Sequence, residues 1–349
     1  MVLTFMLGAM APATAQTLTA KVLGTNLGVS AACKDAAGNV YVVETVAPAQ
    51  NQTQQDAQIV KFAAGTSTPT ILTGTTFQYS EYESVLNFAF GIGVDGSGNI
   101  FVTTYNDYFP SDGRDVTTYG NILKFTPTGG NAYTKSTWVT GEYPSGSTIG
   151  AFGALVIDSH DNIFVDAYSD LDGKYEIIEY PSGSTTATAI YTHIGDAQLA
   201  SSDNYSPFTA LAIDPSDNLY AGTSFSTSGG ADGGKLYKLT KASNYATVTQ
   251  FGTNLYCTAL ACDASGALYG SIGVQSPSAP YTVTSPKIVK FSSDLSTTTP
   301  LYTGVSFGLY APWGLAVPNA TSIFAGAGGG AGSDLGDLVQ LFGTPATPA

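Results

Sequence analysis

The chain has 349 residues, of which 43% are hydrophobic and only 11% charged, and it contains 40 glycines and 21 tyrosines. This composition favours strands and turns over helices, and it excludes an intrinsically disordered chain. The net charge of −14, from 26 acidic and 12 basic residues, argues against a nucleic-acid partner, because a phosphate backbone would be repelled.

The first fifteen residues, "MVLTFMLGAMAPATA", are apolar and end in the small-x-small triplet Ala13-Thr14-Ala15. They resemble the apolar region and cleavage site of a secretory signal peptide, although the basic start is missing. We therefore expect a secreted or periplasmic protein whose mature chain begins near Gln16. No other run approaches the ~18 apolar residues of a membrane span, so residues 16–349 are predicted to form one domain outside the bilayer.

An acidic turn followed by a short apolar run recurs along the chain, as in "DAAGNVYV" from Asp35 and "DGSGNIFV" from Asp95. Similar turns begin at Asp158, Asp214 and Asp263. Four residues before each turn, and at the corresponding place of a sixth copy, stands a small residue: Ala31, Gly91, Ala154, Ala210, Ala259 or Gly314. A larger apolar residue follows in nearly every copy. This pattern predicts a strand that is crowded by its equivalents, as the innermost strand of a propeller blade is.

Three further strands are predicted after each inner strand, but the sixth copy has no fourth strand before the chain ends in "FGTPATPA". Residues 18–24, "LTAKVLG", have the character of the missing strand. We therefore predict an all-β fold, a six-bladed β-propeller with four-stranded antiparallel blades, in which the N-terminal strand completes the last blade. Leu18, Val22 and Leu23 are expected to become buried in that strand.

The small-apolar strand, the D-x-x-G-N turn and the Y-V-type strand resemble the NHL-repeat propellers over nearly all of residues 17–341. The resemblance implies the fold and leaves the activity open. The acidic turns are expected to have a structural role, because an Asp side chain caps its own hairpin and the following residues tolerate a positive φ.

No catalytic residue is predicted. "GVSFG" at 304–308 matches a nucleophile elbow around Ser306, but that motif requires a strand-to-helix turn and a histidine partner. His160 falls in an acidic turn on the face opposite the long loops, and His193 ends an outer strand. The similar streptogramin-lyase-like propellers use a histidine near the central channel, and neither histidine falls there. The three cysteines, Cys33, Cys257 and Cys262, are expected to be unpaired and buried.

A metal site is the second possibility that the sequence raises. Propellers of the gluconolactonase type, which this chain distantly resembles, hold a divalent cation at the channel mouth. Glu44 and Asp166 end second strands, and Asp170 and Asp172 form an Asp-x-Asp-Gly arrangement. Their oxygen atoms suit Ca²⁺, the one cofactor that the sequence suggests. The alternative is that these carboxylates bond to their own loops or lie in solvent.

The loops that join second to third strands, and those between blades, are long and carry aromatic and acidic residues. Such a surface can stack on sugar rings or peptides and bond to their polar edges, although the same rings can instead pin the loops to the scaffold. The predicted ligand-binding residues are Tyr105, Asp107, Tyr168, Tyr205, Phe208, Tyr256, Tyr310 and Trp313. We expect a monomeric binding module for a small molecule, glycan or peptide; the alternatives are a Ca²⁺-dependent lactonase-like hydrolase or lyase and a structural envelope or extracellular scaffold.

Overall fold

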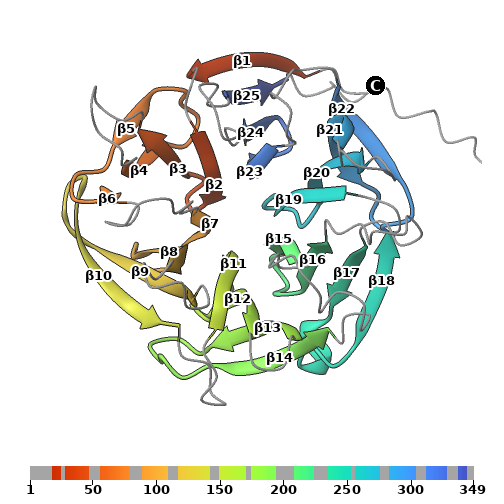
Figure 1. The fold of residues 1–349 in the computed structure, drawn as a ribbon. Helices are drawn as coiled ribbons and strands as arrows, with labels where there is room; N and C mark the ends of the chain where they lie inside the picture. The colour runs from red at the N-terminus through yellow and green to blue at the C-terminus, as the bar shows by residue number, and fades with distance from the viewer. Residues whose placement is uncertain are drawn as a thin grey trace, which may run out of the picture.

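In a computed structural model the chain forms six antiparallel β-sheets that surround a central axis (Figure 1). The structure describes residues 18–24, 28–46, 56–78, 89–108, 117–141, 149–169, 174–193, 208–223, 235–252, 256–275, 283–303, 312–327 and 337–343. The inner strands β2, β7, β11, β15, β19 and β23 each contact the inner strand on either side, so they close a ring around the axis. The chain is a six-bladed β-propeller, as the repeat predicts.

The first three blades are built from consecutive strands, which follow one another from the axis outward. Blade 1 contains β2 (Gly28–Lys34), β3 (Val40–Val46), β4 (Asp56–Phe62) and β5 (Pro69–Ile71), and the two-residue β6 (Phe77–Gln78) also pairs with β4. Blade 2 contains β7 (Ala89–Val94), β8 (Ile100–Tyr108), β9 (Thr117–Gly129) and β10 (Ala132–Thr140). Blade 3 contains β11 (Ile149–Ile157), β12 (Ile163–Ser169), β13 (Lys174–Tyr180) and β14 (Thr188–His193).

The other three blades follow the same order, except that the last takes its outer strand from the N-terminus. Blade 4 contains β15 (Phe208–Ile213), β16 (Leu219–Thr223), β17 (Leu236–Leu239) and β18 (Val248–Gly252), with a short 3-10 helix at Lys241–Ser243. Blade 5 contains β19 (Tyr256–Cys262), β20 (Leu268–Gln275), β21 (Val283–Phe291) and β22 (Thr298–Thr303). Blade 6 contains β23 (Pro312–Asn319), β24 (Ser322–Ala327), β25 (Leu338–Phe342) and β1 (Thr19–Gly24).

The ring closes through β1, which pairs antiparallel with β25 so that Ala20 lies opposite Leu341. Leu18 is buried in the apolar cluster between blades 5 and 6, and Lys21 Nζ donates to Ser67 Oγ of blade 1 at 2.6 Å. The prediction that Val22 is buried is wrong, because 51% of it is exposed, and Leu23 is only half-buried. The blades diverge as their distance from the axis grows, so an outermost strand has less of the neighbouring blade to pack against.

The small residues of the inner strands are required by close backbone packing. A Cβ atom on Gly91 would overlap the backbone of Leu155 in the next blade, and one on Gly314 would lie 3.1 Å from the carbonyl carbon of Ala31. Further out, each seam between blades holds apolar side chains; Tyr41 and Ile59 of blade 1, for example, share a cluster with Ile100 of blade 2. The small-then-large pattern therefore reflects packing around the axis.

The acidic turns have the architectural role that the sequence predicts. Asn39 donates its backbone N–H to Asp35 Oδ1 at 2.9 Å and its side-chain amide to Oδ2 at 2.7 Å. The pairs Asp95–Asn99, Asp158–Asn162 and Asp214–Asn218 repeat this arrangement. The residue before each Asn, or before Ala267 in blade 5, has a positive φ; these residues are Gly38, Gly98, Asp161, Asp217 and Gly266.

Candidate functional site

The central channel is narrow in the part of the chain that the structure describes. Its lining comes from the inner strands and combines small residues such as Ala31, Ala154 and Ala210 with larger ones such as Leu155 and Leu260. The cavity between these strands has a volume of about 40 Å³, room for roughly three water molecules. A cavity of this size favours a ligand site at one of the two faces of the ring over one inside the channel.

The two faces differ in construction. The acidic turns between first and second strands lie on one face, which we call the turn face. The second strands end on the opposite face, which we call the loop face. Each inner strand has a register shift near its loop-face end, and the positions at these shifts are Ser30, Phe90, Gly153, Thr209, Thr258 and Trp313. Six bulges thus surround the loop-face mouth of the channel, where bulges often aim side chains at a site.

Polar groups lie beside several of these bulges. Thr103 Oγ1 of blade 2 donates to the Gly153 carbonyl of blade 3 at 2.6 Å, and Thr258 Oγ1 donates to Ser271 Oγ at 3.1 Å. Asp166 is fully buried on β12 beside Gly153, where a Cβ atom would overlap its carboxylate. The mouth therefore holds a buried carboxylate and several hydroxyls within an apolar frame.

Glu44 is the second buried carboxylate among the predicted metal ligands. It lies on β3 with 8% of its surface exposed, and its Oε1 accepts a 2.6 Å hydrogen bond from Gln58 Nε2. Burial raises the pKa of Glu44, while the bond from Gln58 lowers it. Within the described residues, neither Glu44 nor Asp166 belongs to a group of three potential metal ligands.

The structure places the backbone of six predicted ligand-binding residues. Tyr105 and Asp107 lie on β8, and Tyr168 lies near the end of β12. Phe208, Tyr256 and Trp313 lie at or next to the first residue of inner strands β15, β19 and β23. The side chains of these six lie outside the described part of the structure. Tyr205, Tyr310, Asp170 and Asp172, like residues 1–15, lie wholly outside it.

Blade 2 has a long ladder on the loop face. Its second and third strands, β8 and β9, pair through Tyr105–Gly120 and Asp107–Thr118 as far as Tyr108–Thr117, and we call this pair of strands the extended ladder. In blade 5 the pairing of β20 with β21 continues to Gln275, the residue that corresponds to Asp107. The backbone of Tyr105 and Asp107 therefore lies in the loop-face part of the extended ladder.

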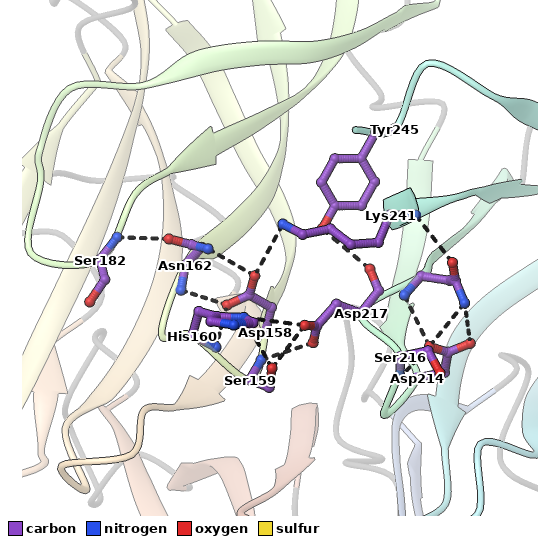
Figure 2. A network of polar contacts seen from close by, with 11 residues as sticks. Asp158, Ser159, His160, Asn162, Ser182, Asp214, Ser216, Asp217, Lys241 and Tyr245 are labelled. Carbon is purple, nitrogen blue, oxygen red and sulfur yellow. Dashed lines mark hydrogen bonds and ion pairs between the residues drawn. The ribbon is translucent and has the colours of Figure 1, made fainter. Parts of the chain in front are cut away.

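A polar cluster on the turn face was not predicted as a site. Asp158 and His160 of blade 3 and Asp217 of blade 4 place one ligand atom each within 4.8 Å of one another (Figure 2). Sequence did offer a signal, because both His160 and Asp217 depart from the repeat. Serine stands in the position of His160 at Ser97, Ser216 and Ser265, and glycine in the position of Asp217 at Gly38, Gly98 and Gly266.

Comparison with known proteins supports the fold. No family model matches the chain, and no curated protein matches it in sequence. A protein of unknown function from Dyadobacter fermentans is similar in structure, with a TM-score of 0.59 and 12% identity over 93% of this chain and 98% of that one. A gluconolactonase from Xanthomonas campestris has a TM-score of 0.56 and 13% identity over 95% and 92%.

A luciferin-regenerating enzyme is also similar, with a TM-score of 0.54 and 14% identity over 94% of this chain and 96% of that one. What these proteins share with the chain is the propeller. At such low identity the likeness carries neither their substrates nor their reactions to this chain. In the described residues, no helix has the length and apolar character needed to cross a membrane.

Proposed function

We propose that this chain is a ligand-binding propeller that holds a carbohydrate or a peptide on its loop face. The observation that carries the proposal is the long ladder of β8 and β9 on that face, whose last residues include Tyr105 and Asp107. Residues with an aromatic ring and a carboxylate suit a ligand that has both apolar faces and polar edges.

Two features support the loop face over the rest of the molecule. The cavity in the channel has a volume of only about 40 Å³, which favours binding at a surface. On the turn face, the carboxylates of Asp35, Asp95 and Asp214 accept bonds from their own turns. The apolar segment that ends at Ala15 supports export of the protein. Outside the cytoplasm, glycans and peptides are accessible ligands.

A glycan and peptide array probed with the full chain tests the proposal. We expect binding that is lost in the double variant Tyr105→Ala, Trp313→Ala. Phe342→Ala is the matched control, because Phe342 is an exposed aromatic residue, 42% accessible, at the turn-face end of β25. Binding that survives the double variant, or that Phe342→Ala abolishes, would refute a loop-face site.

A metal-dependent hydrolase or lyase of the lactonase kind is the second candidate. The positions of Glu44 and Asp166 on second strands of blades 1 and 3 favour it, because carboxylate oxygens are the ligands that Ca²⁺ takes in proteins. Calcium titration of thermal stability is the test, with Glu44→Gln and Asp166→Asn as variants. No stabilisation by millimolar Ca²⁺ in the wild type would remove this candidate.

A further inference from the structure

The turn of blade 3 and the turn of blade 4 are joined by side chains that the repeat does not require. Asp217 accepts hydrogen bonds from the backbone N–H of Ser159 at 3.0 Å and from its hydroxyl at 2.8 Å. His160 Nδ1 lies 3.3 Å from Asp217 Oδ2 and 3.1 Å from Ser159 Oγ (Figure 2). Asp158 is in the same turn as His160, and its side chain has no exposed surface. An imidazole and two carboxylates therefore meet where two blades join.

The two carboxylates of this cluster carry more charge than the nearby lysine offsets. Lys241 Nζ lies 3.7 Å from Asp158 Oδ2 and neutralises part of that charge. One lysine does not balance two carboxylates, so the cluster keeps a net negative charge that attracts a cation.

We propose that Asp158, His160 and Asp217 form a binding site for a divalent transition-metal ion of the Zn²⁺ class. One imidazole nitrogen and two carboxylate oxygens are donors that Zn²⁺ accepts, with water completing four-coordination. In a tetrahedral site with bonds of about 2 Å, neighbouring donor atoms are roughly 3.3 Å apart. His160 Nδ1 and Asp217 Oδ2 already have this separation. The donor atoms of the three residues lie within 4.8 Å of one another, so the widest pair must approach by up to about 1.5 Å to reach the separation found in a tetrahedral site.

The bonds that the ion would meet are compatible with its entry. Asp158 Oδ1 accepts the backbone N–H groups of His160 and Asn162, and these bonds hold the carboxylate in place. Its Oδ2 accepts the Asn162 amide at 2.9 Å and faces the more distant Lys241. With 31% of its side chain exposed, Lys241 can turn toward solvent when a doubly charged ion arrives. His160, 69% exposed, gives the ion a path from solvent.

This site lies on the turn face, so it does not depend on the ligand-binding function proposed for the loop face. Its donors come from two blades, and a bound ion would join the turns of blades 3 and 4. Because an unfolded chain does not bring these residues together, the ion should stabilise the folded state by mass action.

Zinc titration of the full chain, purified without a histidine tag or chelator, tests the proposal by calorimetry and by thermal unfolding. We expect one Zn²⁺ per chain and a higher melting temperature. His160→Ser installs the residue that three other turns carry, and the Ser97 backbone N–H bonds to Asp95 as that of His160 does to Asp158. Asp217→Gly likewise installs a repeat residue and relieves a φ of 59°. Both variants should fold and lose roughly tenfold or more in Zn²⁺ affinity.

Two matched controls isolate the site. His193→Ala removes the other histidine of the chain, and Asp161→Gly makes the same exchange as Asp217→Gly in a turn residue that bonds instead to Gly96. Both should bind Zn²⁺ as the wild type does. Lys241→Met removes the competing cation and should tighten binding. The proposal is overturned if the wild type binds no Zn²⁺, or if His160→Ser and Asp217→Gly bind as tightly as the controls.

Discussion

The Thr103 hydroxyl of blade 2 donates a 2.6 Å hydrogen bond to the Gly153 carbonyl of blade 3, and neither group is exposed to water. The bond joins a second strand to the bulge of the next inner strand. It therefore ties two blades together at the loop-face mouth, where the bulge backbone cannot find a partner in its own ladder.

Thr103→Val should lower the free energy of unfolding by about 1–3 kcal/mol, because valine keeps the shape but leaves the Gly153 carbonyl buried without this donor. Urea unfolding measures the effect. Thr104→Val is the matched control, since the half-buried Thr104 hydroxyl makes only a 3.4 Å contact with the Asn121 carbonyl. Its effect should stay within about 0.5 kcal/mol; equal losses in the two variants would mean that the Thr103 bond does not stabilise the seam.

The closing strand gives a second prediction. A chain that begins at Gly28 lacks β1 and leaves the edge of β25 unpaired, so it should aggregate or melt well below a chain that begins at Gln16. The lost ladder bonds and the burial of Leu18 amount to a few kcal/mol, a large share of a typical ~5–15 kcal/mol. Equal melting temperatures for the two chains would show that β1 contributes nothing to closure.

Leu18, directly before β1, and Val22, within it, should respond differently to truncation. Leu18 is 7% exposed and packs in the apolar cluster between blades 5 and 6, so Leu18→Ala should cost about 2–4 kcal/mol. Val22 is 51% exposed, and Val22→Ala should cost less than about 1 kcal/mol. Chemical denaturation of both variants measures the two losses of stability. If β1 packed on β25 in another register, Val22→Ala would cost as much as Leu18→Ala or more.

Glu44 provides a prediction on pH. Burial holds its folded-state pKa above the usual value, so the folded protein binds the proton more tightly than the unfolded chain does. Between the unfolded and folded pKa values, stability should therefore fall as pH rises. Glu44→Gln keeps an oxygen that accepts from Gln58 and removes the charge, so it should raise the melting temperature at pH 7 and have little effect near pH 4. A lower melting temperature at pH 7 would show that the ionised carboxylate is stabilising, as a metal ligand would be.

The architecture could be predicted from sequence because each blade repeats the same local rules. Each acidic turn, such as those at Asp35 and Asp95, forms within a single blade. Each small residue, such as Gly91 or Gly314, meets the same contact, that between neighbouring inner strands. The exposure of Val22 could not be predicted, because alternation alone does not tell how far an outer strand lies from the next blade. The cluster of His160 and Asp217 also escaped prediction, since it forms only when two turns 57 residues apart, at positions 160 and 217, meet across a seam.

The most direct test of the proposed function is hydrogen exchange of the full chain with and without the strongest ligand from the array. We predict protection on binding in residues 100–108 and 117–129 of the extended ladder and at the first residues of β15, β19 and β23. Little change is expected in the turns at Asp35, Asp95 and Asp214, whose carboxylates are engaged by their own backbones. Protection confined to these turns, with the extended ladder unchanged, would contradict a loop-face binding site.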